Sequence, residues 1–146
     1  MEETASVAVR FQEVDATQLV WHGHYVTYFE VARRAFGRRW DLDYPLFVRH
    51  GVIAPLVHLE LDYRSPARLD DVLEATARLV EPASAKLEFE YDVVRASDGR
   101  LLATGASVQV FTDLEGTLLL TPPGFLVERL KRWEPSWKPP RNPAPV

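Results

Sequence analysis

One helix-like stretch with a wide aromatic stripe, residues 24–39, most constrains how this chain folds, because nearly everything after it is strand-like. Apolar side chains recur there at the spacing of a single helix face: Tyr25, Tyr28, Phe29, Ala32, Ala35 and Phe36. Leaving such a stripe in water costs about 25 cal/mol for each Å² of apolar surface. The helix must therefore cover one face of a sheet.

Alternation of apolar and polar residues predicts the strands of that sheet. They are expected at residues 7–12, 57–64, 73–79, 87–94, 101–111 and 117–120. Asp98-Gly99 is a hairpin turn signal, and residues 122–133 have a second helix-favouring apolar face. We expect the long helix to run from about residue 24 to residue 39, with the segment that leads to Pro45 terminating it. The pattern alone predicts an α+β fold with an antiparallel sheet.

Composition limits the class of protein. With 146 residues, the chain fits a single domain, expected at residues 1–135, followed by a proline-rich, extended tail at 136–146. The net charge of −4 argues against a nucleic-acid scaffold, and the absence of cysteine excludes disulfides, thiolate metal sites and a cysteine nucleophile. No apolar run approaches the ~20 residues of a membrane span, and the acidic start lacks the apolar centre of a signal peptide. We expect a cytoplasmic protein without a membrane partner.

Asp15 is the first candidate for chemistry, seven residues before His22 and just ahead of the long helix. A helix start offers unpaired backbone N–H groups and the positive end of a macrodipole, which suit a carbonyl oxygen that gains negative charge. A nearby carboxylate can act on that carbonyl as a nucleophile or as a general base. We expect neighbouring apolar side chains to desolvate Asp15 partly.

The stretch from Asp15 through the aromatic helix, together with residues 61–71, resembles the hotdog-fold acyl-CoA thioesterases of the 4-hydroxybenzoyl-CoA thioesterase type. The resemblance extends from about residue 7 to residue 133. It implies a hotdog fold, in which one long helix is wrapped by a curved antiparallel sheet of about five strands, with the sheet joined across a dimer. It also implies a homodimer or homotetramer that acts on acyl-CoA without a cofactor or a metal.

In the site that the resemblance implies, Asp15 faces the thioester and the backbone N–H of His22 polarises its carbonyl. The His22 imidazole could also hydrogen-bond substrate or orient Asp15. The family usually has glycine where this chain has Gln18, so Gln18 could reshape the acyl end of the pocket or contact substrate itself. We expect His24 and Tyr25, at the helix start, to contribute to substrate binding.

Other charged residues are weaker candidates. Arg64 and Lys86 lie near strand ends, where they could bind the phosphates of CoA, as could Arg68 and Arg100. Glu30 is a reserve acid, although a structural pairing with Arg33 or Arg34 fits it better. The His22-x-His24 spacing does not predict a metal site, since the two side chains would point to different sides and no further ligands cluster there.

Three functions stay open. The first is hydrolysis of an acyl-CoA thioester to free CoA and a carboxylic acid. The second is release of an acyl chain from an acyl carrier protein, for which the arginines of residues 33–39 could meet an acidic partner. The third is a non-catalytic module that binds an acyl ligand, which absence of the acid at Asp15 would have favoured.

Overall fold

The computed structural model describes residues 1–136, and the expected tail beyond Ser136 lies outside them. The elements are β1 (Glu2–Ala8), η1 (Phe11–Glu13), α1 (His24–Arg39), α2 (Tyr44–Arg49), β2 (Val52–Ile53), β3 (Leu56–Tyr63), β4 (Val72–Leu79), β5 (Lys86–Arg95), β6 (Leu101–Val110), β7 (Thr112–Asp113), α3 (Gly124–Trp133) and η2 (Glu134–Ser136). Five strands form one antiparallel sheet in the order β1-β4-β5-β6-β3, and β2 pairs with β7. This is the expected α+β hotdog arrangement.

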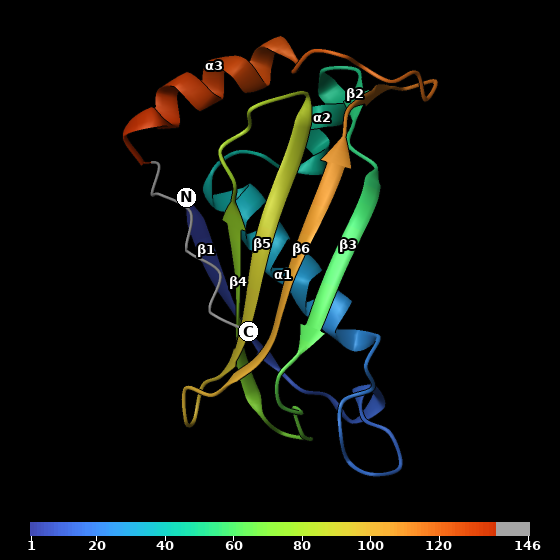
Figure 1. Cartoon of the computed structure of the whole chain (residues 1–146), viewed down its shortest axis with the longest axis vertical. Helices are drawn as coiled ribbons and strands as arrows, with labels where there is room; N and C mark the ends of the chain where they lie inside the picture. Colours follow the sequence, from blue (N-terminus) through green and yellow to red (C-terminus); the bar gives the residue numbers. More distant parts are fainter. Residues whose placement is uncertain (137–146) are drawn as a thin grey trace.

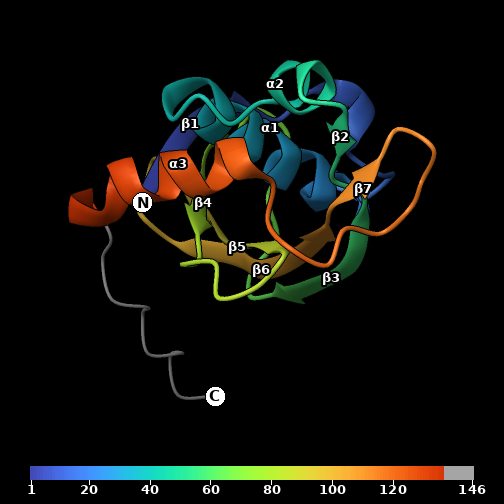
Figure 2. The ribbon, with the colours of Figure 1, turned by 90° about the horizontal axis from the view of Figure 1, so that it is seen from above.

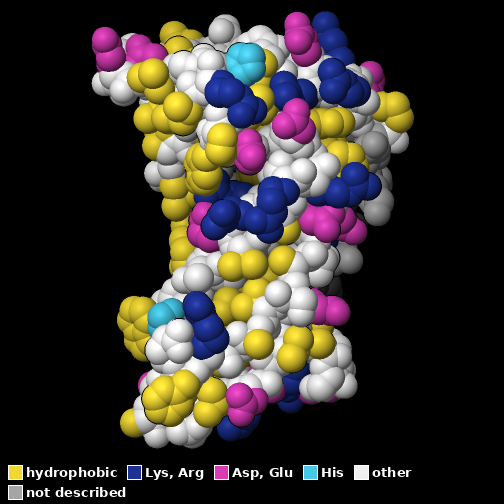
Figure 3. All heavy atoms as spheres, turned by 180° about the vertical axis from the view of Figure 1, so that it is seen from behind, with side chains coloured by type: hydrophobic (Ala, Val, Ile, Leu, Met, Phe, Trp, Pro, Cys, Tyr) yellow, Lys and Arg dark blue, Asp and Glu magenta, His cyan; other side chains and the backbone are white. Residues whose placement is uncertain are grey.

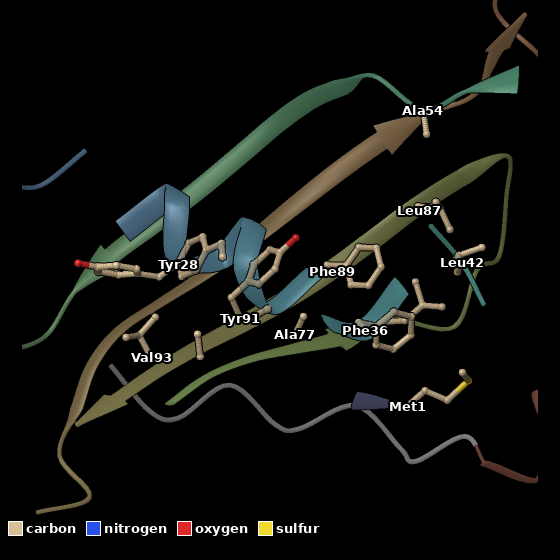
Figure 4. Packing of buried hydrophobic residues seen from close by; sticks show 14 of the residues in the cluster. Met1, Tyr28, Phe36, Leu42, Ala54, Ala77, Leu87, Phe89, Tyr91 and Val93 are labelled. Carbon is tan, nitrogen blue, oxygen red and sulfur yellow. The ribbon is translucent and has the colours of Figure 1, made fainter. Parts of the chain in front are cut away.

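The helix α1 lies against one face of the curved sheet (Figures 1 and 2). It packs mainly on β1, β4 and β5, as the aromatic stripe requires. The Phe29 ring stacks on Tyr91 at 4.5 Å between centroids, and Phe36 meets Phe89 edge-on at 5.2 Å. Figure 4 shows Phe36 of α1 with Phe89 and Tyr91 of β5 within one buried cluster.

Gly105 of β6 permits the close approach of α1. A Cβ atom at this position would lie 2.4 Å from the Phe29 ring and 2.6 Å from the Glu60 carbonyl oxygen. Because real Cβ atoms do not come this close to other heavy atoms, any larger residue would push the helix away from the sheet.

The strand β3 forms an exposed edge of the sheet (Figure 1). Its apolar side chains are poorly covered by the rest of the chain: Leu56 is 49% exposed, Val57 59% and Tyr63 51%. Two further apolar side chains of β3, Leu59 and Leu61, are partly buried against the core. The alternation in β3 therefore predicts a buried face that one copy of the chain buries only in part.

Two predicted strands are wrong in place. The N-terminal strand runs over Glu2–Ala8 and not over residues 7–12, because Glu2–Ser6 pair with β4 along a full ladder despite their polar sequence. Residues 117–120 form no strand, since only Leu118 makes an isolated bridge, to Thr112, and Leu120 is 85% exposed.

The long helix has its predicted bounds at both ends, but Pro45 does not terminate it. It ends at Arg39, and Asp41 takes a left-handed conformation with φ 52° that turns the chain. Pro45 instead lies in the first turn of α2, where its missing N–H costs nothing. Asp43 caps that helix by accepting the Leu46 N–H at 3.2 Å.

Candidate active site

A tight hairpin carries Asp15. Val14 and Val20 pair across it, the Asp15 N–H donates to the Leu19 carbonyl at 2.8 Å, and the Gln18 N–H donates to the Asp15 carbonyl at 3.0 Å. This is a three-residue loop in which the last residue must adopt the left-handed conformation. Gln18 takes that conformation with φ 66°. The glycine-like geometry that the resemblance suggested is therefore present, but a glutamine adopts it.

The Asp15 carboxylate is held by Thr17. The Thr17 hydroxyl donates to Oδ1 at 2.5 Å and the Thr17 backbone N–H donates to the same oxygen at 2.7 Å. The hydroxyl and then the N–H, each stabilising the ionised form, lower the pKa of Asp15 below its usual value. Asp15 is exposed in the single chain, so the expected desolvation by apolar neighbours is not found there.

A turn at Trp21–His24 leads into α1. The His24 N–H donates to the Trp21 carbonyl at 3.0 Å, which closes the turn. The backbone N–H groups of its two central residues, His22 and Gly23, donate to no acceptor within residues 1–136. These N–H groups and the positive end of the α1 macrodipole favour negative charge at this point. The His24 N–H is already bonded to the Trp21 carbonyl and is therefore not a further free donor at this turn.

The Trp21 ring lies across this turn. It approaches His22 with ring centroids 4.6 Å apart and His24 with centroids 5.6 Å apart. A Cβ at Gly23 would lie 2.0 Å from the Trp21 ring, so the present packing of the ring requires glycine at this position.

Asp15 and the helix start meet at one surface cavity of about 330 Å³. Its walls come from the hairpin, from the start of α1 and from the segment that follows β3: Asp15, Leu19, Val20, His22, Tyr25, Tyr63, Arg64, Ser65 and Pro66. Four residues singled out from the sequence therefore share a cavity. Tyr63 falls within the strand predicted at residues 57–64, and nothing in the local sequence marks its contact with a residue 41 positions away.

Other candidates lie elsewhere. Gln18 and His24 do not line the cavity. Lys86 pairs with Val110, whereas Tyr63 pairs with Ala103 of the same strand, so Lys86 lies about 23 Å away, at about 3.3 Å per residue. Within one copy of the chain, Lys86 is therefore not brought to Asp15.

Glu30 has the structural pairing expected from the sequence. Its carboxylate accepts from the Arg33 guanidinium at 2.5 Å, and Arg33 also donates to Gln109 of β6 at 2.7 Å and to the Tyr44 hydroxyl of α2. This network joins α1 to the sheet and to α2. Glu30 does not line the cavity with Asp15.

The buried carboxylate of Glu13 lies directly before the hairpin in the chain. Glu13 is 2% exposed, and its carboxylate accepts the Arg10 backbone N–H at 2.7 Å and the Arg10 guanidinium at 3.2 Å. The Tyr28 hydroxyl is buried and has no hydrogen-bond partner within the described residues. Burial, together with the negative charge of Glu13, raises the pKa of Tyr28. The Trp21 N–H donates to the Glu13 carbonyl at 2.9 Å, so Glu13 ties the hairpin to the helix start.

Among residues 1–136, no three or more His, Cys, Asp or Glu side chains are grouped so as to hold a metal ion. None of the helices in the same range is long and apolar enough to cross a membrane.

Comparison with known proteins agrees with this architecture. The family profile of the Thioesterase-like superfamily matches residues 9–137. The acyl-CoA thioester hydrolase YbgC of Escherichia coli is 28% identical over 92 residues, which cover 63% of this chain and 69% of that protein.

Solved structures give the same result. A hypothetical protein, TT1821, of Thermus thermophilus superimposes with a TM-score of 0.79 at 34% identity, covering 89% of this chain and 98% of that one. The Synechocystis protein Slr0204, a 1,4-dihydroxy-2-naphthoyl-CoA thioesterase, has a TM-score of 0.79 at 18% identity over 92% of this chain and 98% of its own. At that identity, the second likeness speaks for the fold alone. The chain thus belongs to the Thioesterase-like superfamily, and the expected thioester hydrolase of the hotdog fold is confirmed at the level of the family.

Proposed function

We propose that this protein hydrolyses an acyl-CoA thioester to free CoA and a carboxylic acid, with Asp15 as nucleophile or general base and the His22 backbone N–H polarising the carbonyl. The observation that carries the proposal is that Asp15 and His22, whose N–H has no acceptor within residues 1–136, line one cavity. Acyl transfer needs both of these parts, an activated attacking group and a donor for the oxyanion.

The state of Asp15 suits either form of attack. Its lowered pKa keeps the carboxylate ionised at neutral pH. Both hydrogen bonds from Thr17 go to Oδ1, which leaves Oδ2 to attack the thioester carbon or to take a proton from water. Covalent attack would form a mixed anhydride at Asp15 and release the thiolate of CoA, and water would then hydrolyse the anhydride. In the other route, Asp15 takes the proton from a water that attacks directly.

The size of the two effects is adequate. One oxyanion donor is typically worth about 10²–10³ in kcat, and a positioned general base about 10²–10⁴. A thioester is already activated toward acyl transfer, so these contributions suffice without a metal. Arg64 lines the cavity, and its guanidinium would bind a phosphate of CoA.

We also propose that two copies join through β3, so that the cavity lies at the interface, and that such dimers can pair into a tetramer. The other edge of the sheet, β1, is polar, with Glu2, Glu3 and Ser6 along it, which discourages pairing. The β3 edge has exposed apolar side chains, such as Leu56 and Val57. A second copy would bury them.

Light scattering at micromolar concentration tests this assembly. We expect a dimer or tetramer mass for the wild type and a monomer for Val57→Lys, which places a charge on the apolar edge. Ser6→Lys on the β1 edge is the matched control and should keep the wild-type mass. A monomeric wild type would contradict the proposal.

Release of an acyl chain from an acyl carrier protein is a second candidate, favoured by one observation. Lys and Arg side chains gather on the face where α1 and α2 lie (Figure 3). A groove of about 460 Å³ opens there, with Arg34 and Arg38 at its wall, and neither of them forms an ion pair within residues 1–136. Arg33 lines the same groove but is already engaged by Glu30. An acidic carrier would complement the two free arginines.

Release of free thiol from a panel of acyl-CoA esters and acyl-carrier thioesters tests the function. We expect turnover of at least one acyl-CoA, and loss of that turnover in Asp15→Asn. A double variant, Arg34→Glu with Arg38→Glu, should lower kcat/KM for acyl-carrier substrates alone if the carrier is the natural partner. A wild type that binds acyl-CoA but releases no thiol from any substrate would favour the non-catalytic module.

A further inference from the structure

Tyr63 is the residue at the cavity whose contact with the helix start has no evident structural purpose. It is the last residue of β3, and its side chain is 51% exposed. Its hydroxyl donates to the His22 carbonyl oxygen at 2.8 Å. Because an exposed hydroxyl and an exposed carbonyl could each bond to water instead, this contact contributes little to folding.

We propose that Tyr63 is a positioning residue, which keeps the His22 carbonyl oxygen turned away from the reacting carbonyl, so that N–H groups of the turn and not this oxygen face the oxyanion. This inference rests on the proposed function. His22 and Gly23 are the central residues of the turn that the bond from the His24 N–H to the Trp21 carbonyl closes. That bond fixes the ends of the turn and leaves the peptide unit between His22 and Gly23 free to rotate. The Tyr63 hydroxyl fixes this remaining unit.

The direction of the held carbonyl matters for the chemistry. A peptide unit is planar and trans, so its C=O and its N–H point in opposite directions. A freely rotating His22 carbonyl could turn toward the cavity, where its partial negative charge would oppose the developing oxyanion. Anchored by Tyr63, the carbonyl stays on the β3 side of the turn, and the Gly23 N–H of the same unit points the other way.

The support behind Tyr63 is rigid. Its ring meets the Tyr25 ring edge-on, with centroids 5.3 Å apart and planes at 87°. Tyr25 is buried, and its hydroxyl accepts the Ala67 N–H at 2.9 Å. Ala67 in turn accepts the Val20 N–H at 3.0 Å, next to the turn itself. The Tyr63 hydroxyl is therefore held from both β3 and α1 at a fixed place relative to His22.

The variant Tyr63→Phe removes only the hydroxyl and keeps the ring contact with Tyr25. We expect kcat on the best acyl-CoA to fall about tenfold, KM to stay within about twofold, and the melting temperature to change by no more than about 1 °C. Tyr91→Phe is the matched control, because its hydroxyl pairs with Ser107 at 2.9 Å deep in the core. This control should show the reverse, a lower melting temperature with kcat unchanged.

A second measurement does not depend on activity. In ¹H–¹⁵N spectra of Tyr63→Phe, the amide signals of His22 and Gly23 should shift, whereas those of Tyr91→Phe should keep their positions there. An unchanged kcat, a raised KM with unchanged kcat, or unmoved His22 and Gly23 amides would each overturn the inference. If the wild type hydrolyses no thioester, the proposed function fails, and the amide shifts still decide whether Tyr63 orients the turn.

Discussion

Gln18 adopts a backbone conformation that suits glycine, so Gln18→Gly should stabilise the protein. Its φ of 66° costs a residue with a Cβ about 1–2 kcal/mol. Its side chain is exposed and forms no hydrogen bond in the part of the chain that the structure describes, so truncating it loses no contact. Glycine also has more conformational freedom in the unfolded chain, which lowers the free energy of unfolding by about 0.5–1 kcal/mol. The midpoints of these two ranges leave a net gain of about 0.75 kcal/mol in the free energy of unfolding.

For a chain of this length, 1 kcal/mol moves the melting temperature by about 2–4 °C. We therefore expect a rise of about 1–4 °C in a calorimetric or circular-dichroism melt, with a matching shift in the urea midpoint. Gln12→Gly is the control, because Gln12 is also an exposed glutamine but lies in the η1 turn without a positive φ. It should lower the free energy of unfolding by about 0.5–1 kcal/mol. A Gln18→Gly variant that melts below the wild type would refute the argument that the hairpin stores strain at this residue.

Three further predictions concern the site. Asp15→Asn should lower kcat on the best acyl-CoA at least ~100-fold, about 2.7 kcal/mol, with KM little changed in a steady-state assay. Glu30→Gln should have a much smaller effect in the same assay, because Glu30 is bound to Arg33. His22→Ala should also have a much smaller effect, because alanine retains the backbone N–H. Because Thr17 lowers the pKa of Asp15, the carboxylate stays ionised as the pH falls. In a pH–rate profile, kcat/KM should therefore stay level from pH 7 to about pH 5. An acid limb with a midpoint near pH 6 would contradict this. Glu13→Ala would remove the carboxylate that accepts both the Arg10 N–H and the Arg10 guanidinium. A urea titration should show that the free energy of unfolding falls by about 1–3 kcal/mol, whereas a loss below about 0.5 kcal/mol would contradict the anchoring role of Glu13.

The sequence predicted those elements whose pattern reflects local packing. The aromatic stripe of α1 faces a single sheet, so its bounds follow from helical spacing alone. β4, β5 and β6 alternate because one face of each packs against α1 or its neighbours. The bounds of β1 were predicted wrongly, because partners far along the chain hold its residues. Thr4, for example, pairs with Thr76 through their hydroxyls at 2.7 Å.

Prediction of the candidate site divides in the same way. Asp15 and His22 lie close in sequence, so a local motif brings them into view, and the structure places both at one cavity. Tyr63 and Lys86 depend on the register of the sheet, which the motif does not contain. The register brings Tyr63 to the helix start and carries Lys86 to the far end of the same sheet.

The exposed apolar side chains of β3 connect the fold with the candidate site. Its alternating leucines and Tyr63 predict a buried face, yet in one copy Leu56 and Tyr63 remain about half exposed. Exposed apolar surface is unfavourable in water, so a strand with such a face is typical of a chain that buries this face in an assembly. The same strand ends in Tyr63, whose hydroxyl holds the His22 carbonyl. Pairing of β3 with a second copy would therefore steady the strand that orients the helix start, and assembly and catalysis would depend on one edge of the sheet.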